Sequence, residues 1–319
     1  MTARLSAPRR VIINPASFRM SRAGRLQRIM RLLDRYGVRP DFTSAPDTIA
    51  KLLAAHSPDD GPVVVLGGDG TIQAAATWLA TQPEPQRPVI LALGGGRTNY
   101  IAADLRTRRP IVALLERALN DPTRLRIATR HSIEVTQGDQ PAAHAFFIAG
   151  ATVDEVIRDC HAFRSSGPGR WRQGYASTAI RLSQLAIALA LGRRRLHAPA
   201  LSVEGEGLGE LGGPMRVLIL SSLHHQHGWP RPYLSQGEGE IAVTAITDSA
   251  QRFWRRLPGL LNGRSHHDLV PSQGYLSGRS RQITVTGIQQ LCLDGQETDF
   301  DPEQAVVFRP GPALAFVTP

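Results

Sequence analysis

Runs of consecutive apolar residues, each followed by a turn and then by apolar residues at helical spacing, mark the first third of the chain. These runs cover residues 11–14, 63–66 and 89–93. Strands that are apolar on both faces are typical of a parallel sheet covered by helices. Residues 26–33 and 46–55 have the helical spacing, with Ser21 as the expected N-cap of the first helix and Gly37 as its C-cap. The alternation predicts a doubly wound α/β domain, in which ligands bind beyond the carboxyl ends of the strands.

The pattern changes from about residue 127. Short β-rich apolar runs are separated by turns rich in Gly, Pro and Ser, at residues 145–148, 215–220, 241–246, 283–285 and 306–308. This spacing predicts a second, mainly antiparallel domain. Helical spacing interrupts it at residues 177–191 and 252–261.

Charge divides the chain in the same place. The 319 residues carry a net charge of +10, and 36 of the 37 basic residues are arginines. Residues 1–130 hold 20 basic and 10 acidic residues, whereas the remainder holds 17 of each. A basic half favours an anionic partner, such as a nucleotide, an acidic lipid surface or nucleic acid. Nucleic acid is disfavoured, because the basic segment has neither interleaved aromatic residues nor a helix-turn-helix pattern.

The cysteine count and the length of the apolar stretches limit the cellular compartments in which the protein is expected. Two cysteines cannot build a disulfide framework. The first ten residues lack the apolar core of a signal peptide, and no stretch approaches the roughly 20 apolar residues that span a bilayer. We therefore expect a cytoplasmic protein, with peripheral contact at the inner face of a membrane left open.

Two glycine-rich turns connect a predicted strand to a predicted helix. Gly67-Gly68-Asp69-Gly70-Thr71 follows the second strand, and Gly94-Gly95-Gly96-Arg97-Thr98-Asn99 follows the third. Glycines let backbone N–H groups approach phosphate oxygens, and a helix N-terminus favours an anion. A tight strand-to-helix turn also favours glycine, so a purely structural role is the alternative. Neither turn has the Walker or the G-x-G-x-x-G pattern, and the pair predicts one nucleotide crevice.

The first of these turns resembles the signature of the diacylglycerol kinase catalytic-domain family, which shares a superfamily with NAD kinases. Further pieces are collinear with bacterial soluble lipid kinases over nearly the whole chain. Asn14-Pro15-Ala16-Ser17 resembles their Asn-Pro-x-Ser-Gly opening, and Thr43 stands where they carry a nucleotide-contacting threonine. Gly96 to Asn99 resembles their Gly-Thr-x-Asn, and Asp294-Gly295-Gln296 resembles their Asp-Gly-Glu.

The resemblance implies an ATP- and Mg²⁺-dependent lipid kinase that phosphorylates a hydroxyl of diacylglycerol or a similar lipid at a membrane surface. It implies an α/β domain at 1–128 and a C-terminal β-sandwich domain at 129–319 that helps to form the lipid site, with residues 305–319 able to return to the first domain. Asp294 is the implied general base, and Asp69 could hold ATP-bound magnesium. The implied nucleotide-binding residues are Asn14, Thr43, Gly67, Gly68, Asp69, Gly70, Thr71, Gly96, Arg97, Thr98 and Asn99.

Several positions depart from the family pattern. Arg97 replaces a threonine, Tyr100 an aspartate and Phe18 a glycine, while Gln296 stands for the glutamate of Asp-Gly-Glu. Gln236-Gly237 stands where the family has the Asp-Gly of a second-domain magnesium loop. These departures keep open a non-catalytic nucleotide- or lipid-binding regulator. An NAD kinase is a second alternative because that family shares the Gly-Gly-Asp-Gly-Thr turn, although the Asn-Pro opening disfavours it. Asp294-Gly295 alone is also typical of a hairpin turn. The identity of the lipid and the oligomeric state, including a dimer, stay open.

Overall fold

The computed structural model describes residues 5–22, 24–96, 99–108, 110–152, 198–224, 232–264 and 269–319. The expected helix at 177–191 and the two expected site residues Arg97 and Thr98 lie outside the described residues. Among the helices described, none is long and apolar enough to cross a membrane.

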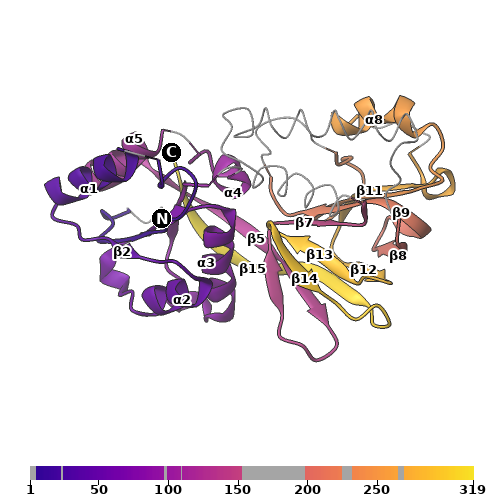
Figure 1. Cartoon of the computed structure of the whole chain (residues 1–319), viewed down its shortest axis with the longest axis horizontal. Helices are drawn as coiled ribbons and strands as arrows, with labels where there is room; N and C mark the ends of the chain where they lie inside the picture. Colours follow the sequence, from indigo (N-terminus) through magenta and orange to yellow (C-terminus); the bar gives the residue numbers. More distant parts are fainter. Residues whose placement is uncertain are drawn as a thin grey trace.

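The N-terminal half is an α/β domain built on four parallel strands, on the left of Figure 1. Their order is β2-β1-β3-β4. The strands are β1 (Arg10–Ile13), β2 (Asp41–Phe42), β3 (Val63–Gly67) and β4 (Ile90–Gly94). The helices are α1 (Arg25–Arg35), α2 (Pro46–Ala54), α3 (Asp69–Thr81), α4 (Tyr100–Asp104) and α5 (Ile111–Asn120). Short 3-10 turns are η1 (Pro58–Asp60), η2 (Glu84–Gln86) and η3 (Pro122–Arg124).

Both faces of this sheet are covered, which explains the uninterrupted apolar runs. In β3, Val63 and Val65 pack into a cluster with Ile72 of α3, whereas Val64 and Leu66 pack into a second cluster with Ile29 of α1. Successive side chains of a strand point to opposite faces, so two covered faces require an apolar residue at every position. The expectation of a doubly wound α/β domain is confirmed.

The first helix starts later than its sequence suggested. Ser21 was the expected N-cap, but α1 begins at Arg25, after Gly24 in the left-handed conformation with φ 81°. Gly37 ends the helix as expected, with φ 67° and an N–H that donates to the carbonyl of Asp34. The N-cap expectation is wrong because Gly24 takes the N-cap position, while the hydroxyl of Ser21 donates to the carbonyl of Phe18 at 3.2 Å.

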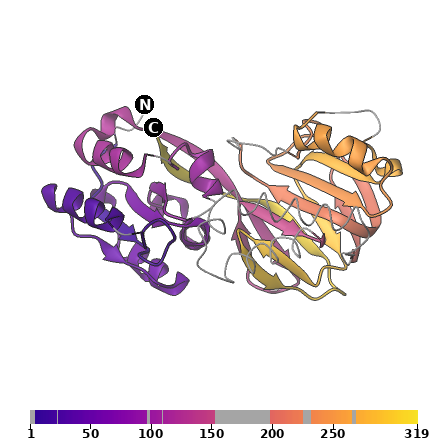
Figure 2. The same ribbon diagram turned by 45° about the horizontal axis from the view of Figure 1, so that its top comes forward.

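The C-terminal half is a mainly antiparallel β-sheet region (Figure 2). Its strands are β5 (Arg126–Gln137), β6 (Ala143–Ala145), β7 (Phe147–Gly150), β8 (Ala200–Gly205), β9 (Gly209–Ser221), β10 (Ile241–Thr247), β11 (Tyr275–Ser280), β12 (Ile283–Thr286), β13 (Gln290–Leu293), β14 (Gln296–Asp299) and β15 (Val306–Thr318). The helix α8 (Phe253–Leu261) and the 3-10 turn η5 (Pro271–Gln273) complete it. The single strand expected at 145–148 is instead divided between β6 and β7, which pair with different strands.

One hydrophobic cluster forms the core of this region. Side chains of β5, β7, β8, β9, β10, β12 and β15 all contribute to it, among them Val135, Ile148, Val203, Val243 and Phe308. Strand β9 pairs with β8 at its start and with β7 and β10 at its end, so it joins the strands on both sides of the core.

Two long strands connect the halves. β5 runs without a break across the expected domain boundary at 128/129, and β15 pairs with it antiparallel along nearly its whole length. Near the chain end, Phe316 of β15 pairs in parallel with Ile90 of β4. The final strand therefore extends the N-terminal sheet, and the C-terminus lies in that half (Figure 1). A buried ion pair between Arg130 of β5 and Asp104 of α4, with an N–O distance of 2.5 Å, also ties β5 to the first domain.

Candidate active site

The strand order of the first domain creates a switch point. From β1 the chain passes outward to β2 and then returns across β1 to β3, so the loops after β1 and β3 leave in opposite directions. In such sheets, ligands bind in the crevice beyond the carboxyl ends of the strands at this point. The loop after β1 begins with Asn14, and the turn after β3 begins with Gly68.

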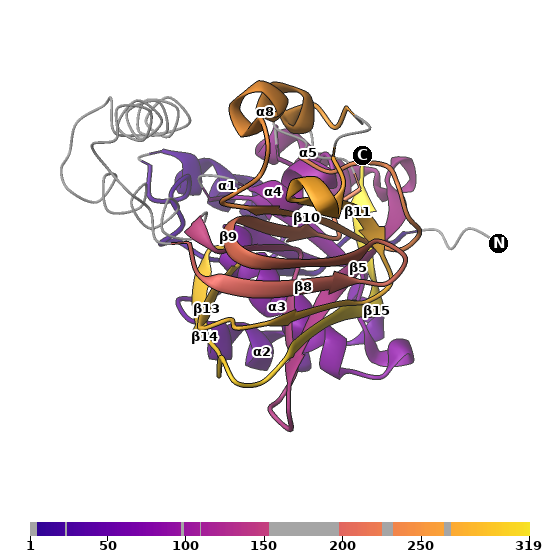
Figure 3. The same ribbon diagram turned by 90° about the vertical axis from the view of Figure 1, so that its right-hand side faces the viewer.

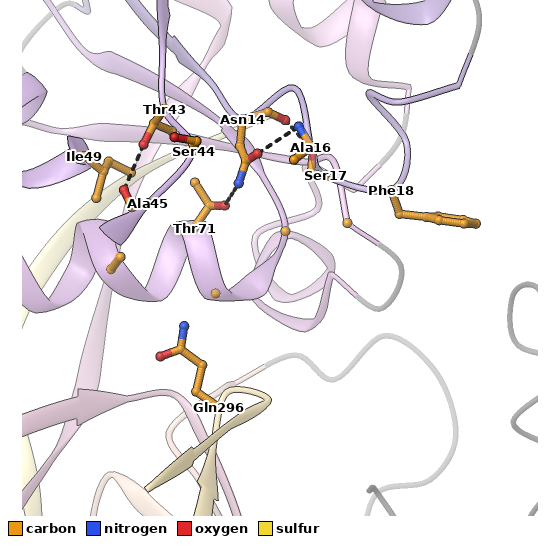
Figure 4. Close-up of a pocket in the computed structure, with 14 residues that line it drawn as sticks. Asn14, Ala16, Ser17, Phe18, Thr43, Ser44, Ala45, Ile49, Thr71 and Gln296 are labelled. Atoms are coloured by element: carbon orange, nitrogen blue, oxygen red, sulfur yellow. Dashed lines mark hydrogen bonds between the residues drawn. The ribbon is translucent and has the colours of Figure 1, made fainter. Parts of the chain in front are cut away.

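A pocket of about 410 Å³ occupies this crevice (Figure 4). Every parallel strand contributes to it through the residues after its carboxyl end. Six of the sequence-predicted residues line the pocket, namely Asn14, Thr43, Gly68, Gly70, Thr71 and Gly96. Gln296 approaches from the β13–β14 hairpin of the other half, below the start of α3 in Figure 4. The pocket is therefore closed on one side by the second domain.

A small hydrogen-bonded group fixes the polar wall of the pocket. The Nδ2 of Asn14 donates to the hydroxyl of Thr71 at 3.0 Å, while its Oδ1 accepts the backbone N–H of Ala16 at 3.0 Å. Thr43 is buried and donates its hydroxyl to the carbonyl of Ala45 at 3.0 Å. These bonds hold the loops after β1 and β2 against the start of α3.

The two glycine turns pack backbone against backbone. A Cβ added to Gly96 would lie 2.6 Å from the Cα of Gly68, and one added to Gly95 would lie 3.2 Å from the Cα of Gly67. Gly95 also donates its N–H to the carbonyl of Gly67 at 2.6 Å. The glycines are thus required by the approach of one turn to the other, which is a structural role that coexists with lining the pocket.

The first turn of α3 presents hydrogen-bond donors at this wall. Helix N-termini leave their first N–H groups without helical partners. The N–H groups of Thr71 and Ile72 donate to the carbonyl of Gly68, whereas those of Asp69 and Gly70 have no partner within the described part of the chain. Unpaired N–H groups at a helix N-terminus form an anion-binding site together with the helix dipole.

Asp69 holds the second glycine turn in place. Its Oδ2 accepts the backbone N–H of Asn99 at 2.7 Å, and its Oδ1 accepts that of Ile101 at 3.3 Å. Asn99 is fully buried with φ 55°, and its side chain bonds both the N–H and the carbonyl of Gly96. Burial raises the pKa of Asp69, and the backbone N–H groups of Ile101, Asn99 and Tyr100 partly offset that rise. Asp69 and Asn99 therefore shape the pocket from behind its lining.

Asp294 lies in the two-residue turn of the β13–β14 hairpin. It has φ 50°, and Gly295 follows with φ 94°, as expected when Asp-Gly forms a tight hairpin. The turn directs the carboxylate toward the start of β7, where Oδ2 accepts the N–H of Phe146 and Oδ1 that of Phe147, both at 2.9 Å. Asp294 can therefore form the hairpin turn and still be a candidate general base.

The pKa of Asp294 is raised to about 8, mainly because its carboxyl is removed from water. The negative charge of Asp69 raises the pKa further, whereas the N–H donors of Phe146 and Phe147 lower it. The two acids, one from each half, are therefore close enough to interact. Asp294 is not among the residues that line the pocket, but Gln296, two residues along the same hairpin, is.

An aromatic pair spans the two halves beside these acids. Tyr100 of α4 stacks on Phe147 of β7, with ring centroids 5.4 Å apart and planes 19° from parallel. Tyr100 directly follows the Asn99 that binds Asp69, and Phe147 donates to Asp294. The pair thus connects the backbone segments that hold the two carboxylates.

Sequence reasoning missed the apolar part of the pocket. Ala45, Ile49 and Ala74 line it from the start of α2 and from α3, and Ser44 lies beside Ala45 on the same side (Figure 4). No local motif marks these residues. In the sequence, they could have been recognised only by their position, either just beyond the end of a strand or on a helix that follows a glycine turn.

Comparison with known proteins places this site in a family. Residues 8–129 match the model of the diacylglycerol kinase catalytic domain. The N-terminal domain of this chain belongs to the diacylglycerol kinase catalytic-domain family. The match covers β1 to β4 with both glycine turns, so it contains every predicted pocket residue of the first domain. No curated protein matches the sequence.

Solved structures extend the likeness to the whole fold. A crystal structure of a protein proposed as a diacylglycerol kinase from Bacillus anthracis strain Sterne is similar with a TM-score of 0.65 at 13% identity, covering 97% of this chain and 96% of that one. A second structure, of a diacylglycerol kinase from the same strain, is similar with a TM-score of 0.62 at 9% identity and the same coverage. At this level of identity, the likeness shows that both halves share the fold.

Proposed function

We propose that this chain is a lipid kinase that transfers the γ-phosphate of ATP to a hydroxyl group of diacylglycerol or a similar lipid. The observation that carries the proposal is the position of Asp294, which the second domain brings beside Asp69 and the glycine turns. A kinase needs a nucleotide pocket, a base for the acceptor hydroxyl and a second domain that holds the acceptor. The family match of the N-terminal domain supports the same activity.

The pocket suits ATP at both ends. At its polar end, the N–H groups of Asp69 and Gly70 at the start of α3 would bind phosphate oxygens, with Thr71 and Asn14 beside them. At its apolar end, Ala45, Ile49 and Ala74 would contact the flat faces of the base. A volume of about 410 Å³ is within the range of small-molecule sites.

Asp294 would act as the general base. In its ionised form it accepts the proton of the lipid hydroxyl, the hydroxyl oxygen bonds to the γ-phosphorus, and the bond between that phosphorus and the ADP oxygen breaks. The N–H groups of Phe146 and Phe147 keep the carboxylate in one orientation. Because burial and the nearby charge of Asp69 both disfavour ionisation of Asp294, the base is strong but charged only at mildly alkaline pH.

The described residues do not fit a dedicated magnesium site. Both oxygens of Asp69 already accept backbone N–H groups, and no group of three or more His, Cys, Asp or Glu side chains clusters within the described ranges. Magnesium commonly binds through the phosphates of a nucleotide with few protein ligands. We propose that it enters with ATP, and no step above depends on a protein ligand for it.

Transfer of labelled γ-phosphate tests the proposal directly. Purified protein would be incubated with labelled ATP and magnesium and with a panel of lipids that carry a free hydroxyl. Appearance of a labelled lipid supports the proposal. In a parallel incubation with NAD, labelled NADP without any labelled lipid would favour an NAD kinase instead. Nucleotide binding with no labelled product would favour a regulator.

The rate of this transfer should rise with pH. Because the folded-state pKa of Asp294 is about 8, its carboxyl is mostly protonated at neutral pH. Below that pKa, the rate should increase about tenfold for each pH unit, and it should level off above it. Initial rates between about pH 6 and about pH 9.5, at saturating ATP, measure the profile. A rate that does not change between neutral pH and pH 8 would contradict an Asp294 base.

Loss of the aromatic pair should lower the rate of phosphate transfer markedly while it lowers the free energy of unfolding only slightly. Tyr100→Ala removes the ring that stacks on Phe147 at 5.4 Å and is expected to lower the free energy of unfolding by about 1 kcal/mol. Because the ring pair connects the segments that hold Asp69 and Asp294, the maximal transfer rate should fall by roughly tenfold or more. Tyr100→Phe keeps the stack and should stay near the native rate. Equal rates for both variants would contradict the positioning role.

A further inference from the structure

Helix α8 lies at the outer end of the second domain, on the far side from α1 and α2 (Figures 1 and 3). Its inner face has a small core of its own. Leu260 packs there with Ile246 of β10 and Tyr275 of β11, together with Leu234 and Leu269, in a cluster separate from the main core of the domain. The helix is therefore anchored to the sheet, and its opposite face is turned outward.

The outward face carries a tryptophan. Trp254 is 56% exposed, the highest exposure among the large apolar side chains described. Its ring rests edge-on against Phe253 at 5.1 Å, and the guanidinium of Arg216 lies 4.5 Å above the ring of Phe253. The indole is thus supported from below while its surface stays open. Val270, which directly follows Leu269 of the same cluster, adds a second exposed apolar side chain.

The same segment is strongly basic. Residues 249–264 contain four arginines and no acidic residue, although residues 131–319 as a whole carry no net charge. Arg255 and Arg264 are exposed and form no ion pair among the described residues. The carboxylate just before the segment, Asp248, is already paired with Arg216 at 2.6 Å. The charge on this face is therefore available to a partner.

The combination of a supported, exposed indole with unpaired arginines favours one kind of partner. Tryptophan is enriched at the boundary between lipid headgroups and acyl chains, because its ring is apolar and its N–H is polar. Arginine binds phosphate groups through its planar fork of donors. A duplex nucleic acid would use the arginines but leave the tryptophan in water, and an acidic protein would do the same.

We propose that the outward face of α8, with Trp254 and Arg255 on the helix and Arg252, Arg264 and Val270 beside it, binds the surface of an anionic phospholipid membrane. The indole would enter the headgroup region, and the arginines would contact lipid phosphates. This binding requires neither ATP nor phosphate transfer, so the proposal stands or fails independently of the proposed kinase activity.

Vesicle sedimentation tests this surface. The full chain is mixed with vesicles of phosphatidylcholine alone or with about 30% phosphatidylglycerol, an anionic fraction that attracts basic protein surfaces. The native protein should bind the anionic vesicles and bind neutral ones weakly, with affinity falling as salt is added. Trp254→Ala should lower the affinity about tenfold, because it removes the buried apolar contact. Arg255→Glu should lower it by at least about fivefold, the effect of one basic residue at such a surface.

Matched variants on the other domain serve as controls. Phe42→Ala removes a side chain of similar exposure, 48%, and Arg31→Glu makes the same charge change on the exposed face of α1. Both should bind vesicles like the native protein, and thermal melting would show that all four variants are folded. Equal binding by the native protein and the α8 variants would overturn the proposal. Equal losses of vesicle binding in the two control variants would also overturn it. So would α8 variants that lose affinity for duplex DNA while they bind anionic vesicles like the native protein.

Discussion

Replacement of Asp294 by asparagine is expected to lower phosphate transfer by about a thousandfold, within the range for loss of a general base. Asparagine has the same shape but cannot take up the hydroxyl proton. Its single oxygen can still accept one of the two N–H groups of Phe146 and Phe147, so the hairpin should keep its place. The dissociation constant for ATP should change little, since Asp294 does not line the pocket.

The matched control lies on the same hairpin. Asp299 is an exposed carboxylate at the end of β14, bonded to the side chain of Gln290 at 2.8 Å. Asp299→Asn should transfer phosphate at the native rate. Steady-state rates and isothermal titration with ATP would separate the two effects. If Asp294→Asn retained transfer within a few-fold of the native rate, the proposed base would be wrong.

A methyl group at Gly96 is expected to disable the nucleotide pocket. The added Cβ of Gly96→Ala would lie 2.6 Å from the Cα of Gly68 and 3.1 Å from the Oδ1 of Asn99. The contact with Gly68 is with backbone and cannot be relieved by rotating a side chain, so the two glycine turns must separate. We expect ATP affinity to fall at least tenfold and the free energy of unfolding to fall by about 1–3 kcal/mol, as for other overpacked sites.

Gly259→Ala is the matched control for this change. Gly259 lies inside α8, and nothing described stands within 4 Å of its added Cβ. Alanine favours a helix over glycine by up to about 1 kcal/mol, so this variant should be as stable as the native protein or slightly more so. Titration with ATP and chemical denaturation measure both variants. Native ATP affinity in Gly96→Ala would show that the contact between the turns does not shape the pocket.

Local patterns predicted the architecture of the first domain, although the short strand β2 matched none of the apolar runs. The apolar runs at 63–66 and 89–93 are both strands, because two covered faces require apolar side chains at every position. Glycine turns after those strands then place residues at a known edge of the sheet. Six predicted residues line the pocket for this reason, while Gly67, Asp69 and Asn99 support it from behind.

Contacts between distant segments could not be predicted in the same way. Only residues 306–308 were predicted as a strand here, yet β15 continues through Pro310-Gly311-Pro312 and pairs with β4 near its end. The approach of Gln296 to Gly70 depends on how the two halves meet. A stack such as that of Tyr100 on Phe147 likewise joins elements that no spacing rule connects. The position of Asp294 was predicted only through its resemblance to a family motif.

Mass spectrometry of a lipid extract, after incubation with the purified protein, ATP and magnesium, measures the proposed lipid kinase activity without choosing the substrate in advance. If the chain is a lipid kinase, a lipid with a free hydroxyl gains one phosphate group with the native protein. The same species should be absent with Asp294→Asn and present with Asp299→Asn. An extract in which no lipid gains phosphate, while the protein demonstrably binds ATP, would contradict the assignment as a lipid kinase.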